Sequence, residues 1–470
     1  TRKGRGRVGN RYHDGSVVGS ILDGSVYQVV ALVHVIVLAR FGSLIENILL
    51  LRKKTEDFQA LFYIPYTIYS TASPRFGNFF FLVHQTMLFS SLLVSTLVSV
   101  ATAANQEVEA IQFSNLGFSG TYNQVEKLSN IYKDSCSCEV NKTPVSFSGT
   151  NAPLNEEVSV HFRGPLVLNK FASYVSDGFK YGDDSSGDWK RLSYYEGSSG
   201  TSENVTFLTS AGKNSSCLGI GLTYAGTDGI SKADSSTVLA KNTLINSNDE
   251  FVIFSNISCG KSGYNNDCGV YRSDIPAYHG FYGTTKMFLF EFQMPNETHT
   301  STDISNYNMP AIWLLNAHIP RTAQYSMNVN CSCWRSGCGE FDIFEVMNST
   351  EYLHMYSTIH DYQGSDDIQT GMAAPAYIER DLTGTMSGGV AFDLSGNAVV
   401  WVSNSTSFDS TIQASSVNSW VKQAGADVAT TLATVTGQSA TTTSKKSGGV
   451  SYQPSFITNL LMTVLTLWVI

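Results

Sequence analysis

Three carboxylates lie close together in an otherwise apolar run of the sequence. Glu340, Asp342 and Glu345 are separated by two and then three positions within the run EFDIFEVM, which begins at residue 340. Carboxyl groups held near one another can act as general acids, general bases or nucleophiles. The spacing therefore raises a catalytic hypothesis before any other feature of the chain is considered.

The residues around these acids predict the element that carries them. The apolar residues of the run are strand formers and Gly339 precedes them, so we predict a β-strand. In a regular strand, Glu340 and Asp342 share one face and Glu345 points into the other, which is apolar. An unpaired carboxylate there is costly. A β-bulge between Asp342 and Glu345 restores the parity and brings all three acids to one face.

Two further runs are expected to lie near this strand. Residues 308–317 read NMPAIWLLNA and carry Trp313, and residues 353–360 read LHMYSTIH and alternate in polarity. One face of the second run consists of His354, Tyr356, Thr358 and His360. If this run pairs with the acidic strand, its polar and aromatic face extends the same cleft. The alternative is a half-buried strand with an ordinary solvated face.

The composition between residues 169 and 405 is that of an all-β domain. This region is rich in Tyr, Phe, Val, Gly and Asn, contains alternating runs such as MFLFEFQM at 287–294, and shows no long helical period. We predict an antiparallel β-sandwich over residues 169–405. Residues 105–168 are expected to form a small Cys-containing N-terminal domain. Residues 406–447 are rich in Ser, Thr and Ala, which is typical of an O-glycosylated stalk.

The N-terminal part of the sequence contains a secretion signal. The first methionine is Met87, and residues 87–104 combine an apolar stretch with a small-residue end, as in a signal peptide. We therefore expect translation to begin at Met87 and residues 1–86 to be untranslated upstream sequence. The alternative is a membrane helix at residues 26–51, but two charged residues interrupt that stretch.

The C-terminal end matches a GPI-attachment signal. Residues 456–470 are apolar and uncharged, and a polar spacer and a small triplet that starts at Ser447 precede them. We predict that the lipid is attached to Ser447, with Gly448 as the alternative, and that residues 448–470 are removed. Fifteen apolar residues are short for a retained membrane span. The mature chain is therefore expected at the cell surface, bound to the plasma membrane through its lipid only, or in the cell wall.

The charge of the chain argues against one class of partner. The formal net charge is −9, and the acidic excess lies after residue 86, because residues 1–86 are basic. An acidic protein without a Gly-rich phosphate loop is not expected to bind nucleic acid.

Cysteines and sequons agree with a secreted chain. The eight cysteines are Cys136, Cys138, Cys217, Cys259, Cys268, Cys331, Cys333 and Cys338. We expect disulfides, whose pairing the sequence leaves open, rather than a zinc site, because the C-x-C-x4-C run lacks a fourth ligand at the usual spacing. The eight N-glycosylation sequons begin at Asn141, Asn204, Asn214, Asn256, Asn296, Asn330, Asn348 and Asn404.

Several of these motifs resemble a known family. EFDIFE resembles the E-x-D-x-x-E signature of laminarinase-type endo-1,3-β-glucanases of glycoside hydrolase family 16, and MPAIWLL at 309–315 resembles the run that precedes that signature. NCSCWRSGCGEFDIFEVM at 330–347, together with the GPI signal, is similar to fungal GPI-anchored cell-wall proteins described as circularly permuted 1,3-β-glucanases. The resemblance covers most of residues 108–405. It implies a concanavalin A-like jelly-roll β-sandwich.

Circular permutation also follows from the lengths of the segments. About 60 residues separate Glu345 from the Ser/Thr-rich region, which is too few to complete two sheets of ordinary size. The missing strands are expected to come from before the motif, from residues 176–197 and 203–208. Neighbouring chain termini make such a permutation tolerable in a sandwich.

The resemblance also implies roles for individual residues. Glu340 is expected to be the nucleophile of a retaining mechanism, Glu345 the general acid/base, and Asp342 the residue that holds the nucleophile. The expected sugar contacts are Trp313, Trp334 and His360. No metal or organic cofactor is expected.

The implied activity is endo-hydrolysis of β-1,3-glucan during assembly or remodelling of the cell wall. One alternative is a wall transglycosylase that uses the same intermediate. The other is a non-catalytic glucan-binding wall protein, against which the intact acid triplet argues.

Overall fold

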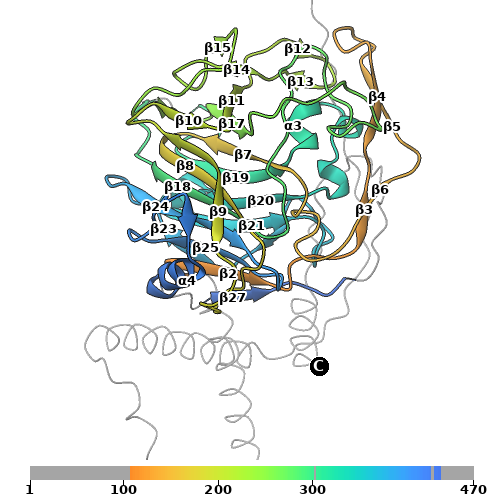
Figure 1. The fold of residues 1–470 in the computed structure, drawn as a ribbon. Helices are drawn as coiled ribbons and strands as arrows, with labels where there is room; N and C mark the ends of the chain where they lie inside the picture. The colour runs from red at the N-terminus through yellow and green to blue at the C-terminus, as the bar shows by residue number, and fades with distance from the viewer. Residues whose placement is uncertain (1–105, 301–302, 425–427, 436–470) are drawn as a thin grey trace, which may run out of the picture. The chain divides into compact units, whose positions relative to one another are not determined.

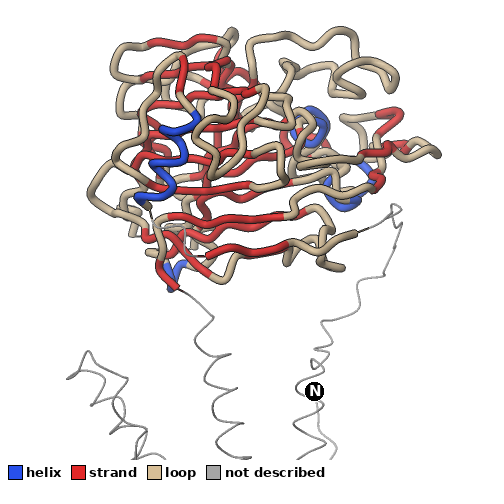
Figure 2. The backbone as a smooth tube through the Cα atoms, turned by 60° about the horizontal axis from the view of Figure 1, so that its bottom comes forward, coloured by secondary structure: helices blue, strands red, loops and turns tan. Residues whose placement is uncertain are grey.

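The described residues fold mainly into two large β-sheets packed face to face. The computed structural model describes residues 106–300, 303–424 and 428–435 (Figure 1). Strands dominate these residues, and helices are few and short (Figure 2). The predicted untranslated segment, signal peptide, lipid-attachment residue Ser447 and residues 448–470 lie outside the described residues. No helix within the described part of the chain is long and apolar enough to cross a membrane.

The acidic strand belongs to an eleven-stranded sheet, which we call the cleft sheet. Its strands, in spatial order, are β1 (Gln106–Glu107), β23 (Ala376–Glu379), β21 (His354–His360), β20 (Glu340–Glu345), β19 (Ala311–Asn316), β7 (Val158–Arg163), β17 (Glu250–Phe254), β11 (Thr206–Thr209), β14 (Thr223–Ala225) and β15 (Lys232–Ala233), with β22 (Met372–Ala373) paired to β21. All neighbouring strands of this sheet pair antiparallel except β1 with β23, which are parallel.

The second sheet has ten strands and is called the back sheet. Its strands, in spatial order, are β10 (Thr201–Glu203), β9 (Trp189–Glu196), β8 (Leu166–Ser176), β18 (Lys286–Gln293), β24 (Met386–Phe392), β25 (Ala398–Val402), β2 (Ala110–Ser114) and β27 (Val428–Thr431), with β16 (Leu244–Ile245) on β8 and β26 (Thr411–Ile412) on β9. The predicted antiparallel jelly-roll sandwich is confirmed. Strands β9 and β11, from the two segments expected to supply missing strands, lie in different sheets.

Aromatic side chains fill the space between the sheets. Phe341 of β20 packs edge-to-face against Phe392 of the back sheet, with ring centroids 5.9 Å apart. Phe344 of β20 and Phe292 of β18 have centroids 5.3 Å apart. These side chains are fully buried. Because side chains alternate along a strand, their burial turns the polar residues of β20 toward the outer face of the cleft sheet.

Two predicted boundaries differ from the structure. The boundary at residue 168 runs through β8, and β7, from the segment assigned to a separate N-terminal domain, lies near the middle of the cleft sheet. The stalk was predicted to begin at residue 406, but α4 (Ala414–Gln423) buries Trp420, which contacts Trp401 with centroids 6.3 Å apart. Both sequence boundaries relied on local composition, whereas the pairing of these segments is determined by contacts distant in sequence.

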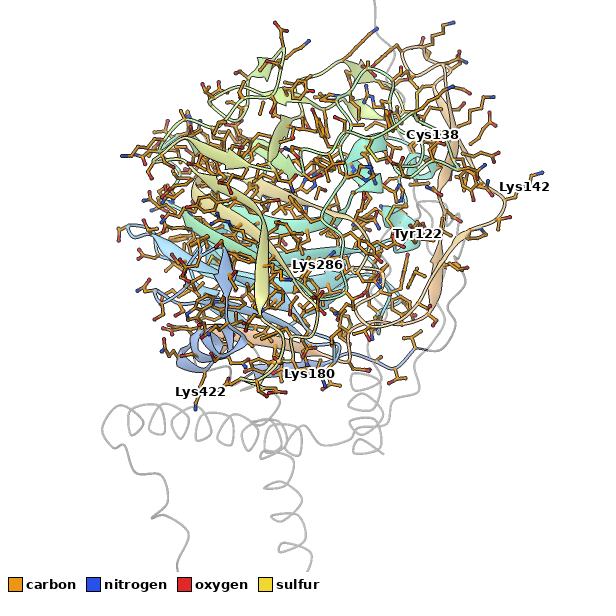
Figure 3. The ribbon with its side chains drawn as sticks, viewed as in Figure 1. Tyr122, Cys138, Lys142, Lys180, Lys286 and Lys422 are labelled. Carbon is orange, nitrogen blue, oxygen red and sulfur yellow. A yellow bond between two sulfur atoms is a disulfide. The ribbon has the colours of Figure 1, made fainter. Side chains whose placement is uncertain are left out.

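The N-terminal strands outside the two sheets pack beside the cleft sheet. They are β3 (Gly120–Tyr122) with β6 (Val145–Phe147), and β4 (Val125–Ser129) with β5 (Ser137–Val140). Figure 3 labels Tyr122 and Cys138 in this region and Lys286 inside the fold. The Tyr122 hydroxyl donates to Glu156, 2.9 Å away, and Asn316 at the end of β19 donates to the same carboxylate at 2.9 Å. These contacts hold the N-terminal segment against β19.

Candidate active site

A β-bulge brings the three acids of β20 to one face. Across β19, Ile312 pairs with Phe344 and Trp313 pairs with Asp342, so Ile343 is the extra residue. The pairing with β21 shifts between Asp342 and Glu345 in the same way. The predicted bulge is therefore confirmed. Ile343 and Phe344 are both fully buried in the core, although they are adjacent in sequence.

The neighbouring strand β21 stabilises this bulge. The hydroxyl of Ser357 donates a hydrogen bond to the carbonyl oxygen of Ile343 at 2.7 Å. A buried carbonyl left unpaired by a bulge is unfavourable, and this bond satisfies it. The expected pairing of β21 with β20 is confirmed, and so is the alternation, because Met355 and Ile359 lie in the core while His360 reaches the acids.

The acids line a cavity of about 480 Å³ on the cleft sheet. The residues expected from the sequence that line it are Glu340, Asp342, Glu345, Trp313, Trp334 and His360. An adjoining cavity of about 1020 Å³ shares Arg163, Gln324 and Tyr325 with the first. The cleft thus continues from the acids across β19, β7 and β17.

Glu340 begins β20 directly after a tight turn. Gly339 has a φ of +106°, which disfavours residues with a side chain, and a Cβ there would lie 3.1 Å from Pro153. The indole N–H of Trp334 donates to the Glu340 carboxylate. Burial and the adjacent negative charge of Asp342 raise the pKa of Glu340 to about 8.

Asp342 forms a buried pair with His360. The Nε2 atom of His360 lies 3.0 Å from a carboxylate oxygen of Asp342, and its Nδ1 lies 2.5 Å from the carbonyl oxygen of Ile368. A carboxylate and a carbonyl oxygen both accept, so this arrangement favours an imidazolium ring with an N–H on each side. Burial alone would lower the pKa of His360, but the hydrogen bond and charge of Asp342 raise it to about 9. The pair leaves no ring nitrogen of His360 free for a sugar.

Glu345 is paired with a cation from β7. A guanidinium nitrogen of Arg163 lies 3.1 Å from its carboxylate, and the Arg163 Nε donates to the carbonyl of Met309 at 2.8 Å. Burial and the charge of Asp342 raise the pKa of Glu345 to about 7, whereas Arg163 opposes the increase. The Arg163 guanidinium also lies 5.9 Å from the centroid of Trp313, so the cation is held between β19 and β20.

Trp313 occupies the floor of the cleft. Its side chain is 4% exposed and stacks on His161 of β7 with centroids 5.1 Å apart. Burial lowers the pKa of His161 to about 3, so this ring is neutral. The cleft floor beside Asp342 is therefore aromatic and uncharged.

Residues of the cleft that the sequence did not single out come from distant segments. Tyr325, which is 60% exposed, donates its hydroxyl to the Glu250 carboxylate at 2.9 Å. Burial raises the pKa of Glu250 to about 7. Arg163 lies on a strand with alternating polarity, VSVHFR, which is a local signal for a polar face. No comparable local pattern identifies Tyr325 or Gln324, because they lie in a connecting segment.

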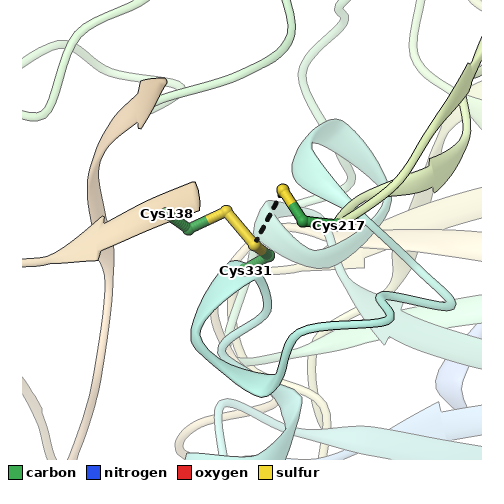
Figure 4. Close-up of side chains that lie close together, drawn as sticks. All are labelled: Cys138, Cys217 and Cys331. Atoms are coloured by element: carbon green, nitrogen blue, oxygen red, sulfur yellow. Dashed lines mark hydrogen bonds between the residues drawn. A yellow bond between two sulfur atoms is a disulfide. The ribbon is translucent and has the colours of Figure 1, made fainter. Parts of the chain in front are cut away.

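Four disulfides crosslink the described residues, and one of them closes the loop next to Glu340. They are Cys136–Cys217, Cys138–Cys331, Cys259–Cys268 and Cys333–Cys338, and they leave no cysteine free. The predicted oxidised state is confirmed. Figure 4 shows Cys138 of β5 bonded to Cys331, with the sulfur of Cys217 3.7 Å from that of Cys331. The Cys333–Cys338 bridge closes the loop that presents Trp334 to Glu340.

Among the residues that the structure describes, two groups of side chains have sulfur or nitrogen atoms close enough together for a metal. They are Cys138, Cys217 and Cys331, and Cys259, Cys268 and His279. Every cysteine in them is in a disulfide and supplies no thiolate ligand. Neither group includes an acid of the cleft.

The predicted glycosylation sites lie at or near the surface. Six of the eight asparagines are exposed, and Asn141 and Asn204 are half-buried. Asn348, which follows β20 by three residues, caps the short helix η3 (Ser349–Glu351) through its side-chain oxygen. None of the eight is buried, so the fold leaves room for glycans at these positions.

Comparison with known proteins identifies the family. Residues 187–420 match the family described as cell wall protein YJL171C/Tos1, C-terminal, and residues 109–176 match its N-terminal counterpart. A Saccharomyces cerevisiae protein named "Probable circularly permuted 1,3-beta-glucanase YJL171C" is 54% identical over 70% of this chain and 83% of the relative. Proteins named "Probable circularly permuted 1,3-beta-glucanase TOS1" are 32% identical in S. cerevisiae, over 69% of this chain and 92% of the relative, and 31% in Candida albicans, over 68% and 91%. No solved structure gives a significant match. The chain belongs to the YJL171C/Tos1 family of cell wall proteins.

Proposed function

We propose that this protein is a retaining endo-β-1,3-glucanase that acts on cell-wall glucan. The observation that carries the proposal is the bulged strand β20, which places Glu340, Asp342 and Glu345 together in one cavity. Burial and like charge raise the pKa of both glutamates, so a protonated and an ionised carboxyl can coexist there. The names of the relatives supply the substrate class.

The mechanism uses the two glutamates in different roles, one as the acid/base and the other as the nucleophile. Glu345 donates its proton to the glycosidic oxygen while the Glu340 carboxylate attacks the anomeric carbon, forming a glycosyl ester and releasing the leaving sugar. Glu345 then removes a proton from water, which attacks the same carbon and regenerates Glu340. Two inversions retain the β-configuration. Trp334 and the Asp342–His360 pair position Glu340 through hydrogen bonding and charge.

One proton must be distributed between the two glutamates. Three carboxyl groups face two cations, His360 and Arg163, and the pKa values of both glutamates are raised, so simultaneous ionisation of Glu340 and Glu345 is disfavoured near neutral pH. In the free site Glu340 has the higher pKa. The proposed roles require this proton on Glu345 when the substrate is bound. The roles themselves are assigned from the positions of the two glutamates in the E-x-D-x-x-E motif.

The extended cleft supports endo action rather than removal of terminal sugars. The two adjoining cavities run from β20 to β11, and their shared residues leave a continuous lining between them. A polysaccharide cut internally needs binding surface beyond the residues that react. Digestion of laminarin, with and without an added acceptor oligosaccharide, tests the proposal. Short products with a newly formed β-anomer support it, whereas acceptor-elongated products favour the transglycosylase, and intact laminarin favours a binding protein.

Replacement of Arg163 by glutamine is expected to move the alkaline limb of the kcat/KM pH profile upward. Arg163 lowers the pKa of Glu345, so its loss raises that pKa by about 1–3 units and delays loss of the last proton that the two glutamates share, which is the step this limb reports. Arg163→Lys retains the charge and should shift the limb much less. An alkaline limb unchanged in Arg163→Gln would exclude Glu345 as the acid that this limb reports.

We also propose that the protein is secreted and lipid-anchored, on the strength of the sequence signals at both ends. Treatment of intact cells with phosphatidylinositol-specific phospholipase is expected to release it, and mass spectrometry should find a mature N-terminus near residue 104 and no peptide from residues 456–470. A Ser447→Leu variant should reduce anchoring, with Ser444→Leu as the control. Recovery of peptides from residues 1–86 in secreted protein would contradict the predicted start.

A further inference from the structure

The cleft sheet continues past the acids on the side opposite the larger cavity. Strand β21 follows β20 on that side, and β23 follows β21 (Figure 1). Glu345 pairs in register with Tyr356 of β21, so the two side chains leave the same face of the sheet next to each other. The cleft face therefore has an aromatic neighbour directly beside the proposed acid/base.

A second tyrosine extends this aromatic surface toward the edge of the sheet. The rings of Tyr356 and Tyr377 of β23 have centroids 6.1 Å apart, and His354 stacks on Tyr377 with centroids 3.7 Å apart. Since neighbouring strands lie about 4.8 Å apart, Tyr377 is roughly 10 Å from the acidic strand. We call His354, Tyr356 and Tyr377 the aromatic row.

Polar groups accompany the row, as they do in sugar-binding sites. The Tyr356 hydroxyl donates to Glu351 at 3.3 Å, and Glu107 of the edge strand β1, which is exposed, pairs in register with Tyr377. All three rings are half-buried, so each keeps part of its surface open to solvent. Ring surface flanked by carboxylates matches a pyranose, which presents C–H groups on its faces and hydroxyls at its rim.

We propose that the aromatic row is a glucan-binding subsite, which takes the part of a β-1,3-glucan chain that extends from Glu345 toward the edge of the sheet. The inference rests on the proposed function, because it assumes that a glucan occupies the cleft. It adds the path of the chain: across β20, β21 and β23 on one side of the acids and across β19, β7 and β17 on the other. The dependence of binding on the length of the glucan is then set in part by Tyr377, which lies two strands away from the three acids.

Tyr377→Ala tests the subsite. Binding of β-1,3-gluco-oligosaccharides of increasing length is measured by calorimetry in a Glu340→Ala background, in which the ligand is not cleaved, and kcat/KM for each length is measured with Glu340 intact. The expected result is about tenfold weaker binding of the longer oligosaccharides, the worth of one aromatic contact, with the shortest ones unaffected. Tyr377→Phe keeps the ring and should bind as the wild type does. Tyr282→Ala removes an exposed tyrosine, 68% accessible, that lines neither cavity, and should change nothing.

The outcomes separate this inference from the proposed function. If the wild type binds and cleaves β-1,3-oligosaccharides but Tyr377→Ala binds all lengths equally well, the subsite is wrong and the proposed function stands. If the wild type binds none of them, both fall. Tyr377→Leu preserves apolar volume, so it provides the same test should the alanine variant unfold, and it must show the same length-dependent loss. An equal loss at every length in either variant, accompanied by a lower melting temperature, would overturn the subsite in favour of a structural role.

Discussion

Glu340→Ala is expected to abolish formation of the glycosyl-enzyme and leave only background cleavage of glucan, because in the proposed mechanism Glu340 is the carboxylate that attacks the anomeric carbon. Added azide can occupy the vacated space and attack directly. A single inversion then gives the α-glycosyl azide. The product is identified by NMR, and the melting temperature of the variant is recorded to show that the fold persists.

Glu345→Ala should behave differently. A substrate with a good leaving group still forms the intermediate, because Glu340 remains, and azide then intercepts it to give the β-glycosyl azide by two inversions. On natural glucan, where the leaving hydroxyl needs a proton, the rate should fall on the order of 10²–10⁴-fold. The matched control is Glu109→Ala, since Glu109 is exposed and lies in neither cavity.

The stereochemistry decides between the two possible role assignments. Glu340 has the higher pKa in the free site, so the alternative to test is that Glu340 is the acid/base and Glu345 the nucleophile. An exchange gives the β-azide from Glu340→Ala and the α-azide from Glu345→Ala. Wild-type rates in either variant would instead exclude that glutamate from the reaction.

The sandwich and the acid strand could be predicted because their signals are local. Alternation of polar and apolar residues along β21, and the short apolar, aromatic-rich run of β18, predict strands whatever their partners are. The bulge in β20 follows from parity alone: Asp342 and Glu345 cannot share a face without one extra residue between them. The physical reason is the cost of a carboxylate in the core, which the sequence already implies.

The parts of the site that the sequence did not predict depend on contacts between distant segments. Arg163 lies 182 positions before Glu345, and no local pattern links the two. Because β7 was assigned to a separate N-terminal domain, its pairing with β19 was not predicted either. Disulfide pairing belongs to the same class, because eight cysteines allow 105 connectivities and spacing does not choose between them.

The prediction of a stalk in the region of α4 was wrong for a different reason. The segment ASSVNSWVKQ is rich in small polar residues, which favoured a stalk, yet Val417, Trp420 and Val421 recur at helical spacing and are buried. An amphipathic pattern over ten residues therefore outweighs composition, because burial of a tryptophan and two valines stabilises a helix that its propensity alone does not.

Phe341→Ala is expected to lower the free energy of unfolding by about 3–5 kcal/mol. The side chain is fully buried between the sheets, where it contacts Phe113 at 5.4 Å and Phe392 at 5.9 Å between ring centroids, and its removal leaves a cavity that neighbouring aromatics cannot fill. Urea-induced unfolding of the non-reduced protein measures the change. Phe341→Leu keeps most of the volume and should cost substantially less.

This substitution also tests the geometry of the catalytic strand. Phe341 lies between Glu340 and Asp342, so a Phe341 side chain that faces the core means that both acids face the cleft, as the backbone pairing of β20 dictates. At a temperature where the variant remains folded, it should retain activity on laminarin, because no atom of Phe341 lines the cavity that holds the acids. A loss of stability below about 1 kcal/mol would mean that Phe341 does not pack between the sheets. The two flanking acids would then face the interior, where a retaining mechanism has no access to glucan.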